Sequence, residues 1–208
     1  MANDLARHLR PAQTAVLTME MQRGVIGDLA NLPELAAEAA ATGIVDRTAH
    51  LLRAARAAGV PVVHCIFESP DAAELNAPIL SAMARLPNRL APGSEAAELV
   101  PELDAQMDDL IESRGHGVSP FGRTLLDATL RQLGISTVVI AGVSVNLGVL
   151  GLAIEAVNAG FRAVVATDAV CGLPRDYAEA VMRNSVALVA TRASVQDIIA
   201  AWGATPEG

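Results

Sequence analysis

The sequence predicts an α/β fold, namely a doubly wound, mostly parallel six-stranded sheet with helices on both faces. The first observation is the order strand, turn, helix, strand between residues 135 and 166, where Thr137–Ala141 and Ala163–Ala166 are short, uncharged apolar runs. Strands joined through a helix in this way run parallel. The second observation is that strand-like and helix-like segments alternate along the chain, which is typical of three-layer α/β/α folds. Third, no internal repeat or low-complexity linker divides residues 1–208, so we expect a single domain.

The first third of the chain contains two predicted strands with a long helix between them. Ala15–Glu20 is mostly apolar up to its last residue, so this strand ends in a carboxylate. A helix begins near residues 31–34, where a proline and an early acid suit the first turn, and it is expected to continue to Ala58. Val60–Phe67 is the second strand. A polar loop at 68–74 follows it and would lie at the rim of any site there.

The middle of the chain is less regular. A short helix is expected at Ala77–Arg85, and the three prolines and one glycine of Leu86–Pro101 indicate an irregular excursion. Leu110–Glu112 can form a short third strand. Leucines at helical spacing then predict a helix over Arg123–Leu133, which ends before a glycine.

The last third returns to regular alternation. The strand Thr137–Ala141 is followed by a turn and then by a continuous apolar helix from about Leu147 to Asn158. After the fifth strand, the predicted elements are a loop at Asp168–Pro174, a helix at Asp176–Ser185, a final strand at Leu188–Thr191 and a terminal helix at Val195–Trp202. Ser194 is a residue type favoured at the N-cap and is the predicted cap of the terminal helix.

Composition narrows the class of function. The net charge is −8 and all 15 basic residues are arginines, without the cluster of positive charge that nucleic-acid binding requires. No apolar run reaches the roughly 18–20 residues that span a bilayer, and the N-terminus lacks the apolar middle of a signal peptide. The two cysteines are too few for a disulfide framework. We therefore expect a soluble cytoplasmic protein that acts on a small molecule and binds neither nucleic acid nor membrane.

Three strand ends are expected to meet at one edge of the sheet, because ligands of such sheets bind beyond the carboxyl ends of the strands. They are Glu20, the loop Arg114–Phe121 and the glycine-rich turn Gly142–Gly148. The backbone N–H of Gly148, in the first turn of the following helix, has the direction that an oxyanion or carboxylate site requires. The turn itself contains no cysteine, lysine or Ser–His pair in the usual catalytic roles.

Two stretches of the chain resemble the isochorismatase-like (cysteine hydrolase) superfamily. AVLTMEMQRGV is similar to its opening strand, which ends in Asp-Met-Gln. Residues 114–170 are similar to its second half, with a Ser-small-Phe segment, a Leu-rich helix, a Gly-Val turn and a later Asp-Ala. The resemblance covers about residues 14–191 and implies the fold of that superfamily. It also implies a non-proline cis peptide near Val143-Ser144.

The chain departs from the superfamily's Asp, Lys and Cys triad at every position. Glu20 stands at the Asp position, Gly115 at the Lys position and Gly148 at the Cys position. Thiolate addition needs a nucleophile, so the usual amidase chemistry is not expected. The metal-ligating Asp-x-His after the second strand is also missing, and we expect neither a metal nor a cofactor. Isochorismatases resemble this chain in having a glycine at the Cys position. They protonate the alkene of a vinyl ether with the carboxylic acid of the motif, and the resemblance implies that Glu20 could do the same here.

Glu20 is the predicted catalytic residue, either as a general acid or base or, alternatively, as the partner of a nearby arginine. Arg114 could anchor a substrate carboxylate in place of the missing lysine, or it could be a solvated loop residue. His116 could titrate near neutrality, or it could simply lie on the surface. The predicted substrate-binding set is completed by Phe121, Ser144, Asn146 and Gly148. For Asn146, capping of the following helix is an equal alternative.

Other polar residues have weaker claims on a functional role. His64 and Cys65 alternate along an otherwise apolar strand and are interpreted as packed core residues. Cys171, in the loop predicted after the fifth strand, is a candidate for a displaced nucleophile, but no basic residue stands beside it. Gln22 follows the motif of the first strand, where the resemblance implies that it supports the loop.

Three interpretations of function follow. The first is a hydrolase that acts on a small, carboxylate-bearing metabolite by acid/base rather than thiol chemistry. The second is a catalytically inactive family member that binds a small molecule or serves as an oligomeric partner. The third is an enzyme of unrelated chemistry that uses Cys171 or His116. Because the helix after Asn146 is apolar nearly all round, which is typical of a buried helix, we also expect a homo-oligomer, a dimer or higher.

Overall fold

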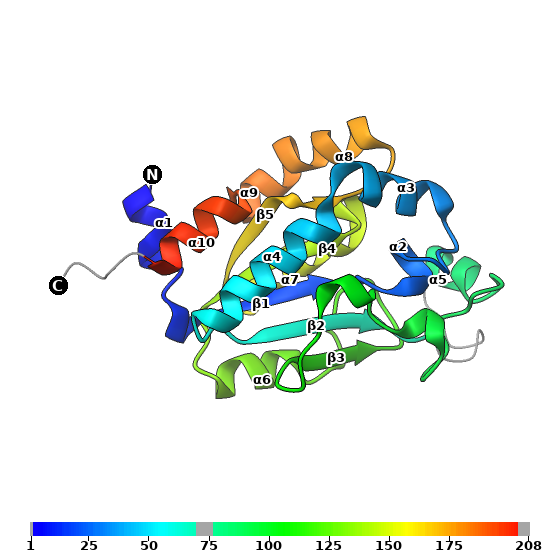
Figure 1. Cartoon of the computed structure of the whole chain (residues 1–208), viewed down its shortest axis with the longest axis horizontal. Helices are drawn as coiled ribbons and strands as arrows, with labels where there is room; N and C mark the ends of the chain where they lie inside the picture. The colour runs from blue at the N-terminus through cyan, green and yellow to red at the C-terminus, as the bar shows by residue number, and fades with distance from the viewer. Residues whose placement is uncertain (1, 70–76, 204–208) are drawn as a thin grey trace.

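A six-stranded parallel sheet with helices on both faces forms the centre of the computed structural model, which describes residues 2–69 and 77–203 (Figure 1). The strands are β1 (Thr14–Met19), β2 (Val62–Phe67), β3 (Leu110–Arg114), β4 (Thr137–Val143), β5 (Arg162–Cys171) and β6 (Thr191–Ala193). Their order in the sheet is β3-β2-β1-β4-β5-β6, and every neighbouring pair is parallel. The predicted doubly wound α/β fold is therefore confirmed.

The helices divide between the two faces of the sheet. One face is covered by α3 (Pro33–Thr42), α4 (Ile44–Ala57) and α10 (Val195–Gly203), with α1 (Ala2–His8) against α10. The other face is covered by α6 (Leu126–Gln132), α7 (Leu150–Asn158) and α8 (Arg175–Val181). The short helices α2 (Arg23–Ile26) and α5 (Pro78–Met83) lie at the right of Figure 1, where β1 and β2 end.

Several single turns connect these elements. The 3₁₀ turns are Pro11–Gln13, Glu95–Ala97 and Pro101–Leu103, the π-helical turns are Val145–Val149 and Met182–Val186, and α9 is Ala187–Val189. No described helix has the length and hydropathy needed to cross a membrane.

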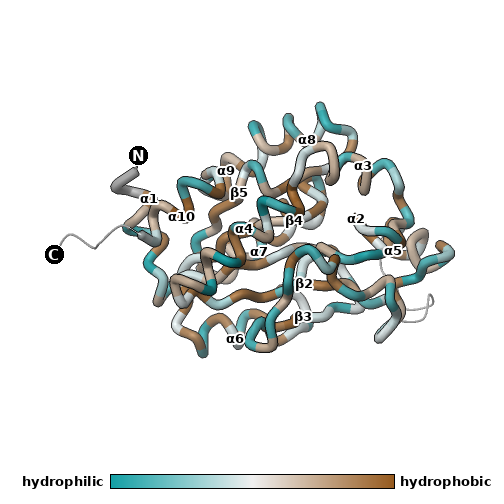
Figure 2. The backbone as a smooth tube through the Cα atoms, viewed as in Figure 1, coloured by the Kyte–Doolittle hydropathy of each residue, from teal (hydrophilic) through white to brown (hydrophobic). Residues whose placement is uncertain are grey.

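The central strands are buried along their whole length. Every residue of β1, β2 and β4 is buried, and their alternate side chains enter two apolar clusters, one on each face of the sheet. Figure 2 shows hydrophobic residues along β2 and hydrophilic residues on α8. Burial on both faces explains why these strands are near-continuous apolar runs rather than alternating ones.

The long helix predicted from residues 31–34 to Ala58 is in fact two helices. Gly43 separates α3 from α4 and adopts the left-handed conformation, with φ of 65°. Its N–H bonds to the carbonyl of Ala40, which closes the first helix. A glycine in this conformation ends a helix without steric cost, and the second helix restarts at Ile44 at a new angle.

Two strand predictions in the C-terminal third are wrong at their boundaries. The fifth strand continues to Cys171 because, after an irregularity, its last residues pair again with β4, with Val143 opposite Cys171. The predicted loop Asp168–Pro174 therefore begins only after this residue. The first two residues of the run predicted as the last strand, Leu188–Thr191, are helical, since the preceding helix continues through a π-helical turn into α9, and Leu188 is 82% exposed. The strand itself begins at Thr191.

Several helix starts also differ from prediction. The helix expected at Arg123–Leu133 begins at Leu126, because Arg123 has a positive φ of 58° and the preceding residues form turns. The helix expected from Leu147 begins with the π-helical turn Val145–Val149. The predicted N-cap is confirmed at Ser194, whose hydroxyl accepts the N–H of Asp197 at 3.1 Å. Most of the polar loop predicted at 68–74 lies outside the described residues.

Candidate functional site

The register of the sheet brings two of the three predicted strand ends directly together. β1 lies between β2 and β4, and Met19 pairs with Cys65 on one side and with Gly142 on the other. Glu20 follows Met19, and its N–H bonds to the carbonyl of Cys65 at 2.9 Å. The carboxyl end of β1 and the turn after β4 therefore meet at one edge of the sheet.

A cavity of about 270 Å³ opens at this edge. Its polar lining comes from four predicted site residues, Glu20, Arg114, Ser144 and Asn146, and Gly148 also borders it. Most of the remaining lining is aliphatic and comes from Val25, Leu32, Leu35, Ile79, Leu80, Met83, Val118, Val143, Leu147 and Leu173. The volume lies just below the range of roughly 300–1,000 Å³ that is usual for small-molecule sites. The arrangement suits a small ligand with one polar end.

Glu20 and Arg114 form an ion pair beside the cavity. The guanidinium Nη2 donates to Oε1 of Glu20, although the two residues come from the ends of β1 and β3 with β2 between them. Arg114 spans this distance by lying over the ring of Phe67, with its guanidinium carbon 5.3 Å from the ring centroid. Arg114 is the last residue of β3 and is buried, so the alternative that it is a solvated loop residue is wrong.

The rest of the Arg114 guanidinium faces backbone carbonyls. Nε donates to the carbonyl of Gly117 at 3.3 Å, and Nη1 donates to that of Ile66 at 3.5 Å. The Arg114 side chain is only 1% exposed, whereas that of Glu20 is 18% exposed. The carboxylate is thus the accessible member of the pair, and the arginine is the buried group that holds it.

The turn after β4 depends on glycines for its close contacts. Gly142 has φ of 111°, and a Cβ there would lie 2.3 Å from the carbonyl oxygen of Met19. A Cβ on Gly172, at the end of β5, would lie 2.7 Å from Oδ1 of Asn146 and 2.9 Å from Oγ of Ser144. The Val143-Ser144 peptide is cis, as the family resemblance implied.

The polar side chains of the turn contact each other. The Ser144 hydroxyl donates to Oδ1 of Asn146 at 2.5 Å. Asn146 lies within the π-helical turn, and the N-cap position is Ser144, whose side chain makes no capping hydrogen bond. The alternative that Asn146 caps this helix is therefore wrong, and both side chains instead border the cavity.

Gly148 is in close contact with Met19. A Cβ at position 148 would lie 2.8 Å from Cε of Met19 and 3.1 Å from the carbonyl oxygen of Val143. Contacts under 3.0 Å require something to move, so the Met19 side chain fills the space that a side chain at 148 would need.

The two remaining predicted site residues lie outside the cavity. His116 borders a different, more open hollow together with Ser119 and Arg123. The ring of Phe121 packs against that of Phe161, with the ring centroids 5.9 Å apart. The structure therefore brings five of the seven predicted site residues together and leaves these two apart.

Neither cysteine has the surroundings of a nucleophile. Burial raises the pKa of the Cys65 thiol to about 12. Burial likewise raises the pKa of the Cys171 thiol to about 11, and Cys171 lies at the end of β5 beside a separate cavity that Glu38 and Thr42 also border. Both thiols are therefore protonated near neutral pH. Because the reactive species is the thiolate and not the thiol, neither cysteine is suited to act as a nucleophile.

His64 belongs to a buried polar chain on the α4 side of the sheet. Its Nδ1 lies 2.8 Å from the hydroxyl of Thr18, and its Nε2 lies 3.3 Å from Oδ2 of Asp109. Arg56 on α4 donates to both carboxylate oxygens of Asp109. His64 and Thr18 are fully buried, so the interpretation of His64 and Cys65 as core residues is confirmed.

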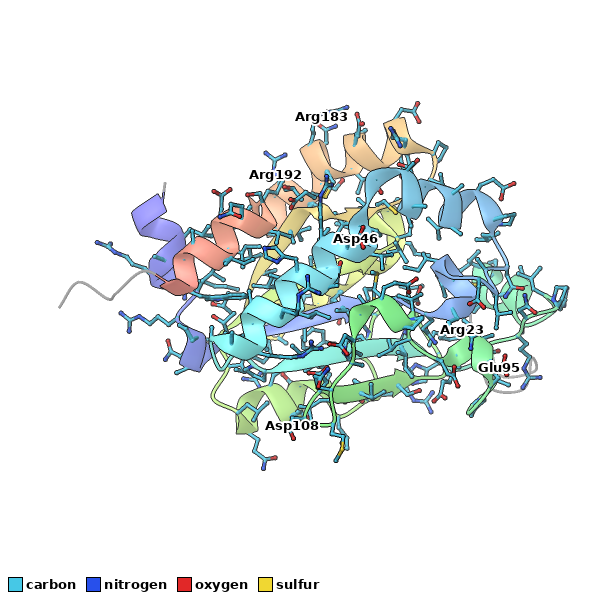
Figure 3. All side chains as sticks on the ribbon, viewed as in Figure 1. Arg23, Asp46, Glu95, Asp108, Arg183 and Arg192 are labelled. Carbon is cyan, nitrogen blue, oxygen red and sulfur yellow. The ribbon has the colours of Figure 1, made fainter. Side chains whose placement is uncertain are left out.

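Two residues after β1 support the segments around the cavity. The Gln22 amide donates to the carbonyls of Phe67 and Ala97 and accepts the N–H of Phe67, all at 2.9 Å, which confirms its supporting role. Arg23 on α2 pairs with Asp28 and Glu98 at 2.9 Å, and these hydrogen bonds raise the pKa of its guanidinium. Figure 3 shows Arg23 close to Glu95 at this rim.

The aliphatic lining was missed by the sequence reasoning. Leu32 and Leu35 come from the start of α3, and Ile79, Leu80 and Met83 come from α5. Their residue types resemble those of ordinary core positions, so no sequence signal separated them from the core. Among the described residues, no three of His, Cys, Asp and Glu are grouped so that they could hold a metal ion.

Comparison with known proteins gives consistent matches. The family model described as the Isochorismatase domain matches residues 14–197. The uncharacterized isochorismatase family protein YwoC of Bacillus subtilis is 37% identical over 87 residues, which are 42% of this chain and 46% of that protein. The match thus spans less than half of that relative.

Two further matches cover more of both chains. Ureidoacrylate amidohydrolase RutB of Methylobacterium radiotolerans is 29% identical over 178 residues, which cover 77% of this chain and 68% of that protein. The solved structure of an isochorismatase family protein from Burkholderia thailandensis has a TM-score of 0.74 and 26% identity, and the match covers 93% of this chain and 97% of that one.

Proposed function

The chain belongs to the isochorismatase family of hydrolases, and on this basis we propose that it hydrolyses a small molecule by acid/base chemistry at Glu20 rather than through a thiol. The observation that carries the proposal is the position of Glu20. Its carboxylate lies at the carboxyl end of the central strand, borders the cavity and is held by a buried arginine. A positioned carboxylate of this kind contributes about 10²–10⁴-fold to a proton-transfer step.

In this proposal Glu20 transfers the proton and Arg114 positions it. As the carboxylate of an ion pair, Glu20 can accept a proton from a water molecule while the water oxygen forms a bond to the substrate. It can then give that proton to the leaving group as the bond between the leaving group and the substrate breaks. Arg114 acts through Glu20, since its own side chain is almost fully buried. The hydrogen bonds from Arg114 to backbone carbonyls keep the pair in one geometry.

The turn after β4 supplies the binding groups. We assign contact with the polar part of the substrate to Ser144 and Asn146 and to the backbone N–H of Gly148, all of which border the cavity. Backbone N–H groups at the start of a helical turn favour an oxyanion. His116 and Phe121 have no part in the proposed reaction, because both lie outside the cavity.

The ion pair also fits a second candidate, a family member that binds a small molecule without turning it over. Glu20 is already engaged by Arg114, and Gly148 offers no side chain. The two candidates differ in one measurable property, because the second predicts ligand-induced stabilisation without product.

We further propose that the chain forms a homo-oligomer through the outer side of α7. On α7, Ile154 is 38% exposed and Val157 is 42% exposed, and Leu147 in the preceding π-helical turn is 42% exposed, although the opposite side of α7 is buried in the core. Apolar side chains grouped on one exposed helix face favour contact with a second copy.

The proposed chemistry is tested by Glu20→Gln. Because glutamine keeps the size of the side chain and loses the proton-transfer group, we expect turnover to fall about 10²–10⁴-fold with the fold unchanged. Initial rates are measured on a panel of small esters, amides and vinyl ethers that includes isochorismate. The matched control is Glu95→Gln, an exposed glutamate at the rim labelled in Figure 3, which should keep full activity. Full activity in Glu20→Gln would show that Glu20 is not the catalytic group.

A further inference from the structure

The charges that border the cavity cancel within the protein. Among the described residues that line it, Glu20 and Arg114 are the only charged ones, and they pair with each other. Ser144 and Asn146 are polar but uncharged, and the rest of the lining is aliphatic or glycine. A ligand entering this cavity therefore meets no net charge that would balance a charge of its own.

Arg114 offers almost no exposed surface to a ligand carboxylate. Its three guanidinium nitrogens face Glu20 and the carbonyls of Gly117 and Ile66, and its side chain is 1% exposed. A second anion at the guanidinium would compete with Glu20, which already accepts a hydrogen bond from Nη2. The expected role of Arg114 as a substrate-carboxylate anchor is therefore not supported by this geometry.

The accessible member of the pair is the carboxylate of Glu20. A second carboxylate close to it is disfavoured by repulsion between like charges. Burial of a charge against aliphatic side chains without a partner adds a desolvation cost. Both effects oppose an anionic ligand, and neither opposes a neutral one.

We propose that the site takes an uncharged molecule with a small aliphatic body and one polar end that both donates and accepts hydrogen bonds. The polar end would donate to Glu20 and accept from the Ser144–Gly148 turn, while the aliphatic body packs against residues such as Leu35 and Leu80. This inference rests on the proposed function, since it names the substrate class of the same site. It replaces the carboxylate-bearing substrate expected from the sequence.

The proposal is tested with a pair of ligands that have the same shape and different charge. Binding of 4-methylpentanamide and of 4-methylpentanoate to the full-length protein is measured by calorimetry at one pH near neutrality. We expect the amide to bind at least about tenfold more tightly. The cation 4-methylpentylamine serves as a third ligand and should also bind more weakly than the amide, because the cost of desolvating its charge exceeds its attraction to a carboxylate that Arg114 already neutralises.

A charge change in the protein should shift this preference. Glu20→Gln leaves the positive charge of Arg114 uncompensated, so the preference for the amide over the carboxylate should fall at least about tenfold. Glu95→Gln, which changes an exposed charge that is not part of the cavity lining, should leave it unaltered. Thermal unfolding of each variant establishes that it is folded.

Three results would overturn the inference. They are wild-type binding of the carboxylate or the amine as tight as that of the amide, no shift in preference in folded Glu20→Gln, and failure of the amide to bind at millimolar concentration. These outcomes are separate from a failure of the proposed chemistry, because they are read from binding alone. A Glu20→Gln variant without turnover would still support that chemistry if the wild type preferred the carboxylate.

Discussion

At Gly148 a side chain that could carry a nucleophile would require Met19 to move and would lie close to the carbonyl oxygen of Val143. The Met19 thioether occupies this space, with Cε 2.8 Å from where a Cβ would lie. Met19 immediately precedes Glu20, so the residue that fills the gap and the residue proposed to do the chemistry are neighbours in sequence. The position of Gly148 is thus closely packed by the residue that precedes Glu20.

This packing predicts that Gly148→Ala destabilises the protein. A methyl group forced against Met19 and the carbonyl of Val143 should lower the free energy of unfolding by about 1–3 kcal/mol. The matched control is Gly151→Ala on α7, where a Cβ would meet only Val118 at an ordinary 3.7 Å. That variant should be neutral or stabilised by up to about 1 kcal/mol. Urea unfolding measures both, and equal stability of the two variants would contradict the packing argument.

Glu20 and Gly148 were predictable from sequence as site residues. A nearby arginine was one expected alternative for Glu20, but the pairing with Arg114 and the packing of Gly148 against Met19 were not specified. Both predicted residues lie at strand or helix ends within a recognisable pattern, and parallel strands bring such ends to one edge of the sheet. The contact of Glu20 with Arg114 crosses β2, so it depends on strand order and on the length of an arginine side chain. Similarly, the contact of Gly148 with Met19 depends on how β1 packs under the turn.

At the scale of elements, the sequence predicted the central strands well and was less accurate at the points where helices end. Burial on both faces makes the central strands visible as apolar runs. The division of the long helix at Gly43 could not be predicted from the sequence, because a glycine in a helical pattern can either lie within the helix or end it. The end of α8 was misread since its apolar continuation around Leu188 has a strand-like composition and yet remains helical.

The buried chain from Thr18 through His64 and Asp109 to Arg56 joins β1, β2, α4 and the residue before β3, and it predicts a pH dependence of stability. Burial lowers the pKa of His64 below 6.5, against the opposing effect of Asp109. Below pH 6.5, His64 is therefore protonated in the unfolded chain at pH values where it stays neutral in the folded chain. Stability is complete above this pH and should fall as the pH decreases, by up to about 1.4 kcal/mol per pH unit for one proton.

The measurement is urea unfolding at several pH values between about 5 and 8, the range in which histidine titrates. His64→Gln should flatten the slope below pH 6.5, whereas His50→Gln, an exposed residue of α4, should keep the wild-type slope. Burial alone would raise the pKa of Asp109, but the hydrogen bonds from Arg56 hold it below its usual value. Its contribution is thus lost only at lower pH. An unchanged slope in His64→Gln would contradict this assignment.

At the scale of the whole molecule, the exposed apolar side of α7 predicts self-association. Light scattering at micromolar concentration should give a mass at least twice that of the chain. Ile154→Glu places a charge within the proposed contact and should shift the mass toward that of one chain. Met107→Glu, at a fully exposed position before β3, should leave it unchanged. A wild-type mass equal to one chain would show that this side of α7 faces solvent.

The most direct test of hydrolysis without a protein thiol is the turnover of a cysteine-free protein, Cys65→Ala with Cys171→Ala, compared with the same protein carrying Glu20→Gln. Both thiols are buried and protonated near neutral pH, and neither borders the cavity among its described lining residues. We predict that the folded cysteine-free protein keeps the wild-type rate and that the added Glu20→Gln lowers it about 10²–10⁴-fold. Loss of turnover in the folded cysteine-free protein, or its retention after Glu20→Gln, would contradict the account.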